Sequence, residues 1–351
     1  MRARPTVLVS TVTLALLLSA GAACGHTTEP LPTPLPEPRA TAGQMPGSSS
    51  TTRVLAVSVD GLNTDAIRAL GRDGAPTFHR MLNDGAATLN ARTEPEQTVT
   101  LPNHTSMMTG RRIDQALGGH GVTWDDDRRA MTVEKAAGHR VASIFTAVHA
   151  GGGSTALFST KEKFGLYDRS WPGAIDHFRV DLDQPALVAA ARRDLVRSTR
   201  TFTFLHLSLP DQAGHAYGGM TPEYLDAVRT TDRLIGTLLR AIGRNAGLAH
   251  DLVVVLTADH GFAPGVRDHS ARGMITNYRV PFLVWGAGVE AADLYALNPD
   301  YRDPGTRRPG YGGIRQPVRN GDVANLAADL LGLDPVPGSE LDVEQDLDVA
   351  R

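Results

Sequence analysis

The sequence predicts an α/β fold: a single large domain with a mostly parallel central sheet covered by helices on both faces. Short β-branched runs alternate with segments whose apolar residues have helical spacing. This alternation is typical of parallel strands that are connected by helices. The runs are continuously apolar, which is typical of strands buried on both faces. A composition of 41% hydrophobic and 21% charged residues fits a globular protein.

The amino terminus carries features of export. Arg2 and Arg4 precede an uncharged run, and Ala20-Gly21-Ala22 supplies the small residues of a cleavage site, so residues 1–23 are predicted to be a signal peptide. Cys24 is the only cysteine, which excludes an intramolecular disulfide, and its position resembles a lipidation site. We therefore expect an exported protein. It is either extracellular or anchored at the cell surface through a lipidated Cys24.

The rest of the chain divides into a tether, a domain and a tail. Residues 24–52 are rich in Pro, Thr, Ser and Gly, a composition that favours a tether over a folded unit. We expect the folded domain over residues 53–340 and a carboxyl-terminal tail over 341–351. The chain has 35 basic and 38 acidic residues and a net charge of −3, which argues against a surface that coats nucleic acid. No feature indicates an oligomeric state.

The first half of the domain is expected to begin with a buried strand over residues 54–59. Helices around residues 66–70 and 78–82 and a strand over 86–93 follow. Pro102 suits the first helical position, so a helix is predicted from there through Met108. The next expected elements are an irregular stretch at 118–127, a helix at 133–138, a strand at 141–146 and a glycine loop at 150–154.

The second half continues the alternation. The Thr221-Pro222-Glu223 segment is typical of a helix start, and apolar side chains continue at helical spacing until Gly243. Asp322 is expected to cap the last helix, which ends at Gly332. The other expected elements are a helix at 185–196, strands at 201–208, 251–257 and 280–285, and a long loop at 304–317.

Three acidic residues follow three of the expected strands. Asp60, Asp211 and Asp259 would meet at one edge of the sheet, because the carboxyl ends of parallel strands lie together and form the ligand-binding edge. His215 lies four residues after Asp211, and His260 is adjacent to Asp259. Carboxylate and imidazole ligands suit zinc, and they also accept manganese or iron.

With His269 added, the set is large enough for two divalent ions, which we expect to be zinc. The first ion would be held by Asp211, His215 and His269, and the second by Asp60, Asp259, His260 and the Thr100 hydroxyl.

Thr100 is the expected nucleophile. It lies beside a helix start, where unpaired N–H groups and the helix dipole favour an anion. Alone it would be an ordinary capping threonine. Beside a divalent cation, its weakly acidic hydroxyl becomes a usable nucleophile, and a second ion can hold the phosphoryl oxygens during an in-line displacement.

Four segments resemble, in chain order, the alkaline phosphatase superfamily, and most closely its type I phosphodiesterase and nucleotide pyrophosphatase branch. They are Val-Ser-Val-Asp60-Gly61, Thr100-Leu-Pro-Asn103-His104, Pro210-Asp211-x-x-x-His215 and Ala-Asp259-His260-Gly261. The resemblance implies an alkaline phosphatase-like fold, metal ligation by the aspartates and histidines, Thr100 as covalent nucleophile, and a small phosphate ester as substrate.

Two features depart from that branch. Asp125 stands where the family has an asparagine that donates to the phosphoryl group. An ionised carboxylate would repel phosphate, so Asp125 must be protonated, metal-bound or turned away, or Trp124 lines the pocket instead. Asn103 is a separate candidate donor to the substrate, with a structural role at the helix start as its alternative. Lys161-Glu162-Lys163 is similar to a Lys-Asp-Lys element of phosphonoacetate hydrolases. Two ammonium groups would favour a more highly charged substrate, although a solvated charged run remains an alternative.

The sequence thus predicts an exported metal-dependent hydrolase of phosphodiester or pyrophosphate bonds that acts through a phospho-threonine. A phosphomonoesterase or phosphonate hydrolase of the same superfamily is the nearest alternative. A non-catalytic surface protein that keeps the fold and binds ligands is the more distant one, and Asp125 is its main support.

Overall fold

The computed structural model describes residues 52–271 and 273–350, and their strands form one eight-stranded sheet in the order β4-β3-β5-β1-β6-β7-β2-β8. The expected export signal and Cys24, and the expected tether up to residue 51, lie outside the described residues. The strands are β1 Arg53–Val59, β2 Ala86–Arg92, β3 Thr155–Ser159, β4 His177–Val180, β5 Phe202–Leu207, β6 Leu252–Thr257, β7 Arg279–Gly286 and β8 Ala292–Asp293.

The sheet is mostly parallel, as predicted. Strand β1 lies at its centre and pairs in parallel with β5 and β6, with Val54 opposite Phe202 on one side and Val253 on the other. Strands β3 and β4 extend the parallel part. Strand β7 runs antiparallel to both β6 and β2. The carboxyl ends of β1, β5 and β6 therefore lie side by side at one edge.

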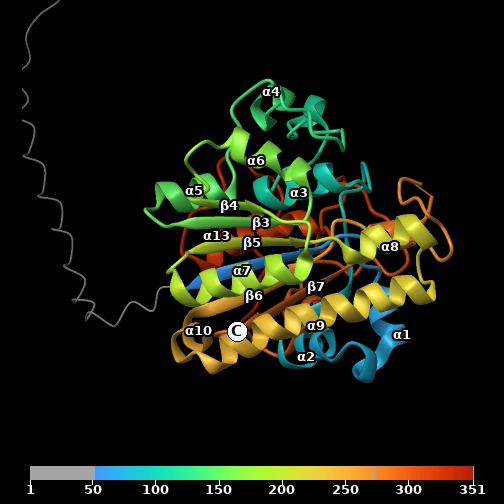
Figure 1. The fold of residues 1–351 in the computed structure, drawn as a ribbon. Coiled ribbons are helices and arrows are strands. Elements are labelled where there is room, and N and C mark those ends of the chain that lie inside the picture. Colours follow the sequence, from blue (N-terminus) through green and yellow to red (C-terminus); the bar gives the residue numbers. More distant parts are fainter. Residues whose placement is uncertain (1–51, 272, 351) are drawn as a thin grey trace, which may run out of the picture. The chain divides into compact units, whose positions relative to one another are not determined.

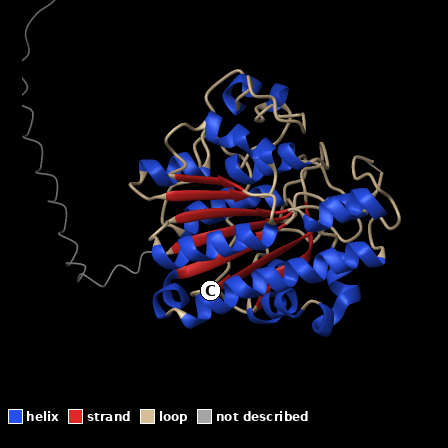
Figure 2. Cartoon of the chain, in the orientation of Figure 1, coloured by secondary structure: helices blue, strands red, loops and turns tan. Residues whose placement is uncertain are grey.

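Helices cover both faces of the sheet (Figures 1 and 2). Helices α3, α5 and α13 contact one another on one face, and α1, α2, α7 and α9 pack on the other. The helices are α1 Thr64–Gly74, α2 Pro76–Asp84, α3 Thr100–Thr109, α4 Val133–Ala137, α5 Ile144–Ala150, α6 Gly165–Ser170, α7 Gln184–Arg197, α8 Leu209–Tyr217, α9 Pro222–Arg244, α10 Ala246–Asp251, α11 Ile275–Tyr278, α12 Leu294–Leu297 and α13 Val323–Leu330, with 3₁₀ turns at Gln115–Leu117, Glu162–Phe164 and Asn320–Asp322.

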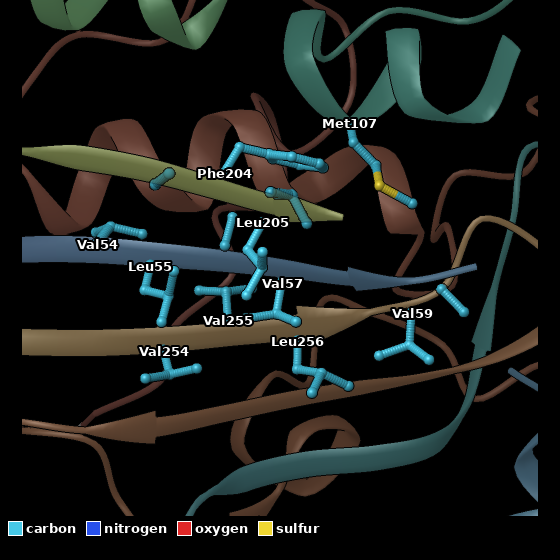
Figure 3. Close-up of a cluster of buried hydrophobic side chains, with 14 of the residues drawn as sticks. Val54, Leu55, Val57, Val59, Met107, Phe204, Leu205, Val254, Val255 and Leu256 are labelled. Atoms are coloured by element: carbon cyan, nitrogen blue, oxygen red, sulfur yellow. The ribbon is translucent and has the colours of Figure 1, made fainter. Parts of the chain in front are cut away.

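The core lies between the central strands and these helices. Every residue of β5 and β6 is buried, in keeping with a sheet covered on both faces. Figure 3 shows side chains of β1, β5 and β6 on both faces of the sheet, with Met107 of α3 pointing towards it. Each fully buried Val, Leu or Phe contributes roughly 1.5–3 kcal/mol. Burial of these strands therefore fixes the positions of their carboxyl ends.

The expected strand at residues 141–146 is wrong, because the chain forms helix α5 from Ile144. Ser143 closes a capping box: its side chain accepts a hydrogen bond from the Thr146 N–H, and the Thr146 hydroxyl accepts one from the Ser143 N–H. This reciprocal cap outweighs the strand propensity of the flanking Val and Ile residues. Helix α3 also differs from expectation, because it begins at Thr100, two residues before Pro102.

The last described residues pack against the domain. Leu341, Leu347 and Val349 are buried, and the Val349 carbonyl accepts a hydrogen bond from the Glu290 N–H. Residues 341–350 therefore contribute to the same core. No helix within residues 52–271 or 273–350 combines the length and apolar character needed to span a bilayer.

Candidate active site

Three aspartates meet at the carboxyl ends of the central strands. Asp60 follows β1, Asp259 follows β6, and Asp211 lies in the first turn of α8, just after β5. All three are buried. The parallel register of β1 with β5 and β6 brings them together although they are distant in sequence.

Gly61 holds this edge tightly. Its φ of +71° lies in the left-handed region, and a Cβ there would lie 2.9 Å from the Asp211 Cα. Its N–H donates to Asp259 Oδ1 at 3.0 Å, and its carbonyl accepts a hydrogen bond from the Tyr224 hydroxyl. Only glycine allows this close approach, so Gly61 sets the separation of the three aspartates.

The first group of candidate ligands comprises Asp60, Asp259 and His260. Their ligand atoms lie within 4.8 Å of one another. His260 Nε2 is 3.4 Å from Asp60 Oδ1 and 3.3 Å from Asp259 Oδ2. These three atoms are buried and have no hydrogen-bond partner, which is unusual for polar atoms in a protein interior.

The second group comprises Asp211, His260 and His269, again within 4.8 Å. Asp211 Oδ1 is 3.8 Å from the Nε2 atoms of both histidines and also lacks a hydrogen-bond partner. The His260 and His269 rings stack with centroids 3.6 Å apart. His260 therefore belongs to both groups, whereas the sequence analysis assigned it to one ion.

His215 lies next to the second group. Its Nε2 is 3.4 Å from Asp211 Oδ1 and 3.2 Å from His269 Nε2, and its Nδ1 contacts the Arg267 carbonyl oxygen at 2.9 Å. Its side chain is 50% exposed, whereas that of His269 is buried. His215 thus lies on the solvent side of the cluster.

The cluster has the electrostatics of a cation site. Burial and the nearby charge of Asp60 raise the pKa of Asp259 well above its usual value. Burial opposes the charge of His260, but Asp259 and Asp60 raise its pKa to about 9. Burial and His260 lower the pKa of His269 to about 3, so its ring is neutral, the form that binds metal. Convergent, unpartnered carboxylate and imidazole atoms fit divalent cations such as zinc.

Thr100 is the first residue of α3 and is buried. The helix is preceded by Val99, which offers no side-chain cap, so the helix start depends on groups from elsewhere. The next N–H, that of Leu101, donates to Asp125 Oδ1 at 3.0 Å. The Thr100 hydroxyl therefore lies at a helix terminus that already holds an anion.

Lys161 connects Thr100 to the aspartates. Its Nζ is 2.5 Å from Asp60 Oδ2, 2.6 Å from Asp211 Oδ2 and 3.5 Å from Thr100 Oγ1. Burial opposes its charge, but the two carboxylates raise the pKa of Lys161 above its ordinary value. The ammonium occupies the Oδ2 atoms and leaves both Oδ1 atoms facing the histidines. Its side chain is 18% exposed, so Lys161 reaches both the buried aspartates and solvent.

Lys163 and Asp125 form an ion pair beside the start of α3. Lys163 Nζ lies 2.7 Å from Asp125 Oδ1, the same oxygen that accepts the Leu101 N–H. Asp125 is 41% exposed. Trp124 is buried, with the Arg128 guanidinium 5.0 Å from its ring centroid and no partner for its indole N–H. The negative charge of Asp125 is thus balanced by Lys163.

Asn103 is buried and holds the loop that leads into α3. Its Nδ2 donates to the carbonyls of Gln97 and Val99, and its Oδ1 accepts from the Thr93 hydroxyl and the Glu94 N–H. Both amide hydrogens are used. The side chain has no free donor for a substrate, because it fixes the backbone that precedes Thr100.

Two buried histidines that the sequence analysis did not place in the site contact its residues. His206 Nε2 lies 2.9 Å from Asp60 Oδ2. His104 Nδ1 lies 2.8 Å from the Thr100 carbonyl oxygen and 3.6 Å from Asp259 Oδ2, and its Nε2 contacts Ser58 Oγ at 2.8 Å. The only sequence signal for His206 was an ionisable residue inside a mostly apolar strand.

The match to a sequence-family model places the chain in the alkaline phosphatase superfamily. The sequence model of the family described as type I phosphodiesterase/nucleotide pyrophosphatase matches residues 54–310. The chain belongs to this family, as the sequence motifs predicted. The family is metal-dependent, in agreement with the two candidate ligand groups.

Two curated relatives illustrate the range of similar proteins. GPI ethanolamine phosphate transferase 1 of Yarrowia lipolytica is 32% identical over 146 residues, covering 40% of this chain and 15% of that protein. Ectonucleotide pyrophosphatase/phosphodiesterase family member 1 of Mus musculus is 24% identical over 236 residues, covering 63% of this chain and 25% of that protein. The chain thus matches only a fraction of the length of either relative.

Solved structures share the fold. Murine ectonucleotide pyrophosphatase/phosphodiesterase 5, as an inactive variant in complex with AMP, superposes with a TM-score of 0.60 at 15% identity, covering 86% of this chain and 100% of that chain. The human protein of the same name gives a TM-score of 0.58 at 15% identity, covering 85% of this chain and 99% of that chain. These comparisons confirm the predicted architecture.

Proposed function

We propose that the protein is an exported, metal-dependent hydrolase of phosphodiester or pyrophosphate bonds that acts through a covalent phospho-Thr100 intermediate. The observation that carries the proposal is the hydroxyl of Thr100 at the start of α3, linked through Lys161 to Asp60 and Asp211. This hydroxyl, the helix N-terminus and the two candidate ligand groups lie together at the sheet edge where α/β proteins bind ligands, which supports the proposal.

The reaction takes place in two displacements. Thr100 Oγ1 bonds to phosphorus, the bond from phosphorus to the leaving oxygen breaks, and the threonine proton ends on that oxygen. Water then attacks the phospho-threonine: the water oxygen bonds to phosphorus, the bond between phosphorus and Thr100 Oγ1 breaks, and one water proton goes to Thr100 Oγ1. Because the α3 terminus and Lys161 lie beside the reacting oxygen, they favour the negative charge that develops there.

Asp60, Asp259 and His260 would hold one divalent ion, and Asp211, His215 and His269 would hold the second, with His260 close to both. When bound, such ions lower the pKa of a hydroxyl and hold phosphoryl oxygens. Zinc suits these nitrogen and oxygen ligands best. His206 would orient Asp60 through its contact with Oδ2, and His104 would orient Thr100 through its contact with the Thr100 carbonyl oxygen.

The lysine contacts favour a diester over a more highly charged substrate. Lys161 is paired with Asp60 and Asp211, and Lys163 with Asp125. Each ammonium is therefore neutralised by a carboxylate. Neither supplies the extra positive charge that would bind the second negative charge of a phosphomonoester. A monoesterase or phosphonate hydrolase, the nearest alternative, would need a lysine freed from its carboxylate partner.

A transferase is a second candidate, favoured by the similarity to GPI ethanolamine phosphate transferase 1. The first displacement would be the same, and an alcohol instead of water would accept the group from Thr100. Product analysis with glycerol or ethanolamine as added acceptor distinguishes the two. Hydrolysis predicts free phosphate products at every acceptor concentration, whereas a transferase predicts a new ester that increases with the acceptor.

Substitution of the nucleophile tests the proposal. We expect Thr100→Ala to lower kcat on bis-nitrophenyl phosphate by roughly a hundredfold or more, because the covalent route is removed, while metal content stays the same. Thr109→Ala, another buried threonine of α3, is the matched control and should keep its activity. Unchanged turnover in Thr100→Ala would reject the covalent mechanism, and absence of turnover in the metal-loaded parent would favour the non-catalytic alternative.

A further inference from the structure

Helices α7 and α9 enclose a groove lined by five arginines. It has a volume of about 390 Å³, and its charged side chains are Arg192, Arg193, Arg197, Arg240 and Arg244. No acidic residue lines it, and Val196 lies among the arginines with 48% of its surface exposed. We call these five arginines and Val196 the arginine groove. The two helices lie side by side on one face of the sheet (Figure 1).

These arginines have no counter-charge in the described part of the chain. None of the five makes an ion pair or a side-chain hydrogen bond there, whereas nearby Arg200 pairs with Asp194, and Arg53 donates to the carbonyls of Leu195, Ser198 and Arg200. Like charges gathered without a partner repel one another. The groove is therefore complementary to a polyanion outside the domain.

The helix dipole accounts for only part of the cluster. Arg197 and Arg244 lie in the last turns of α7 and α9, where a cation stabilises the helix terminus. Arg192, Arg193 and Arg240 lie further from the helix ends. The exposed Val196 among the guanidinium groups suits a surface that presents both phosphate and acyl groups.

The groove lies at the end of the sheet opposite the candidate active site. Helix α7 ends at Arg197, five residues before β5 begins at Phe202, and thus at the amino ends of the parallel strands. A neighbouring cavity of about 970 Å³ is lined by Val196 and Arg197 together with Thr52 and Arg53. The chain therefore enters the domain next to the arginine groove.

We propose that the arginine groove docks the domain on an anionic phospholipid membrane. The guanidinium groups would contact headgroup phosphates, and Val196 would insert at the boundary with the acyl chains. Docking at this end would leave the active-site edge facing away from the bilayer, open to soluble substrates. A nucleic acid is a weaker match, because the sugar-phosphate backbone offers no apolar partner for the exposed Val196, whereas the acyl boundary of a bilayer does.

Vesicle cosedimentation tests the proposal. The full chain carrying Cys24→Ser, which cannot be lipidated at that position, is mixed with vesicles of phosphatidylcholine alone or with 30% phosphatidylglycerol (roughly a third of the lipid, enough for a negative surface potential). The groove variant is Arg193→Gln, Arg197→Gln and Arg240→Gln. The matched control removes the same charge at exposed sites elsewhere, with Arg140→Gln, Arg302→Gln and Arg315→Gln.

We expect the parent and the control variant to bind anionic vesicles with equal affinity. The affinity of the groove variant should be at least tenfold lower, approaching roughly a hundredfold for the loss of three surface charges. Added salt should weaken binding of the parent. The residues before Thr52 are common to all three proteins and cancel in the comparison. Phosphodiesterase activity should be equal in all three, so failure of this proposal is separable from failure of the catalytic one.

Two results would overturn the membrane assignment. One is equal binding of the groove and control variants to anionic vesicles. The other is competition in which duplex DNA or inorganic phosphate displaces the parent from vesicles at charge-equivalent concentration, because the groove would then be a general polyanion or phosphate site.

Discussion

Single side chains around Thr100 determine which substrates the site can accept. Asp125 Oδ1 accepts hydrogen bonds from the Leu101 N–H and the Lys163 ammonium, two donors that could otherwise bind a phosphoryl oxygen. The sequence indicated that a carboxylate here would repel phosphate unless it were protonated, metal-bound or turned away. In the structure it is neutralised instead, by a lysine 38 positions further along the chain.

Asp125→Asn should therefore strengthen binding of anionic substrates. An amide can still accept the Leu101 N–H, but it leaves the Lys163 ammonium without its counter-charge and free to attract phosphate. We expect KM for bis-nitrophenyl phosphate to fall about three- to tenfold at low salt, as for one exposed charge near the site, with kcat little changed. Steady-state kinetics across ionic strength provide the measurement, with Asp126→Asn, an exposed neighbour, as control. An unchanged or raised KM would contradict this assignment.

At the scale of elements, the site depends on how three strand ends and α8 approach one another. The strands themselves were predictable, because continuous β-branched runs leave few alternatives to a buried parallel strand. The spacing between strand ends was not, since it depends on Gly61, whose missing Cβ lets α8 approach β1. The sequence showed a glycine after Asp60 but not what it contacts.

Gly61→Ala and Gly265→Ala separate two effects of a new Cβ: backbone strain at a positive φ, and contact with a neighbouring backbone. Both glycines have a φ of +71°, so alanine should destabilise the fold at either position by about 1–2 kcal/mol. Only at Gly61 does the new Cβ meet backbone, that of Asp211, whereas Gly265 has nothing within 4 Å. We expect both variants to lower the denaturation midpoint, Gly61→Ala more strongly because its Cβ also meets the Asp211 backbone, and we expect kcat and metal affinity to fall in Gly61→Ala alone. Equal activity of the two variants would show that the close approach is not needed.

For the molecule as a whole, a buried acid beneath the candidate site makes stability depend on pH. Glu94 is fully buried next to Tyr311 and Arg319. Burial raises its pKa to about 7, against the opposing effects of Arg319 and the Tyr311 hydroxyl. Because the folded state binds this proton more tightly than the unfolded state, stability is fully present below about pH 4.5 and is lost as pH rises through about 7.

Glu94→Gln should remove this dependence. We expect ionisation of this group to lower the free energy of unfolding of the parent by up to about 3 kcal/mol between pH 4.5 and 7.5. The free energy of unfolding of Glu94→Gln should not show this part of the decrease. Urea denaturation at both pH values provides the measurement, with Glu344→Gln at an exposed position as control. Parallel pH profiles for parent and Glu94→Gln would mean that Glu94 ionises normally in the fold.

Local pattern alone determined the buried strands β1, β5 and β6 and the carboxylate and imidazole residues that follow them, because burial on two faces and metal chemistry restrict residue type at each position separately. It did not predict β3, β4 or β8. Where local signals competed, as at Ser143, periodicity was insufficient, because a reciprocal cap of two hydroxyls decided for helix. Only the tertiary structure decided that Lys161 bridges Asp60 and Asp211, that His260 faces both ligand groups, and that five arginines share one groove. Those relations join residues tens to hundreds of positions apart, and the packing of the sheet and helices, not any short segment, sets the distances between them.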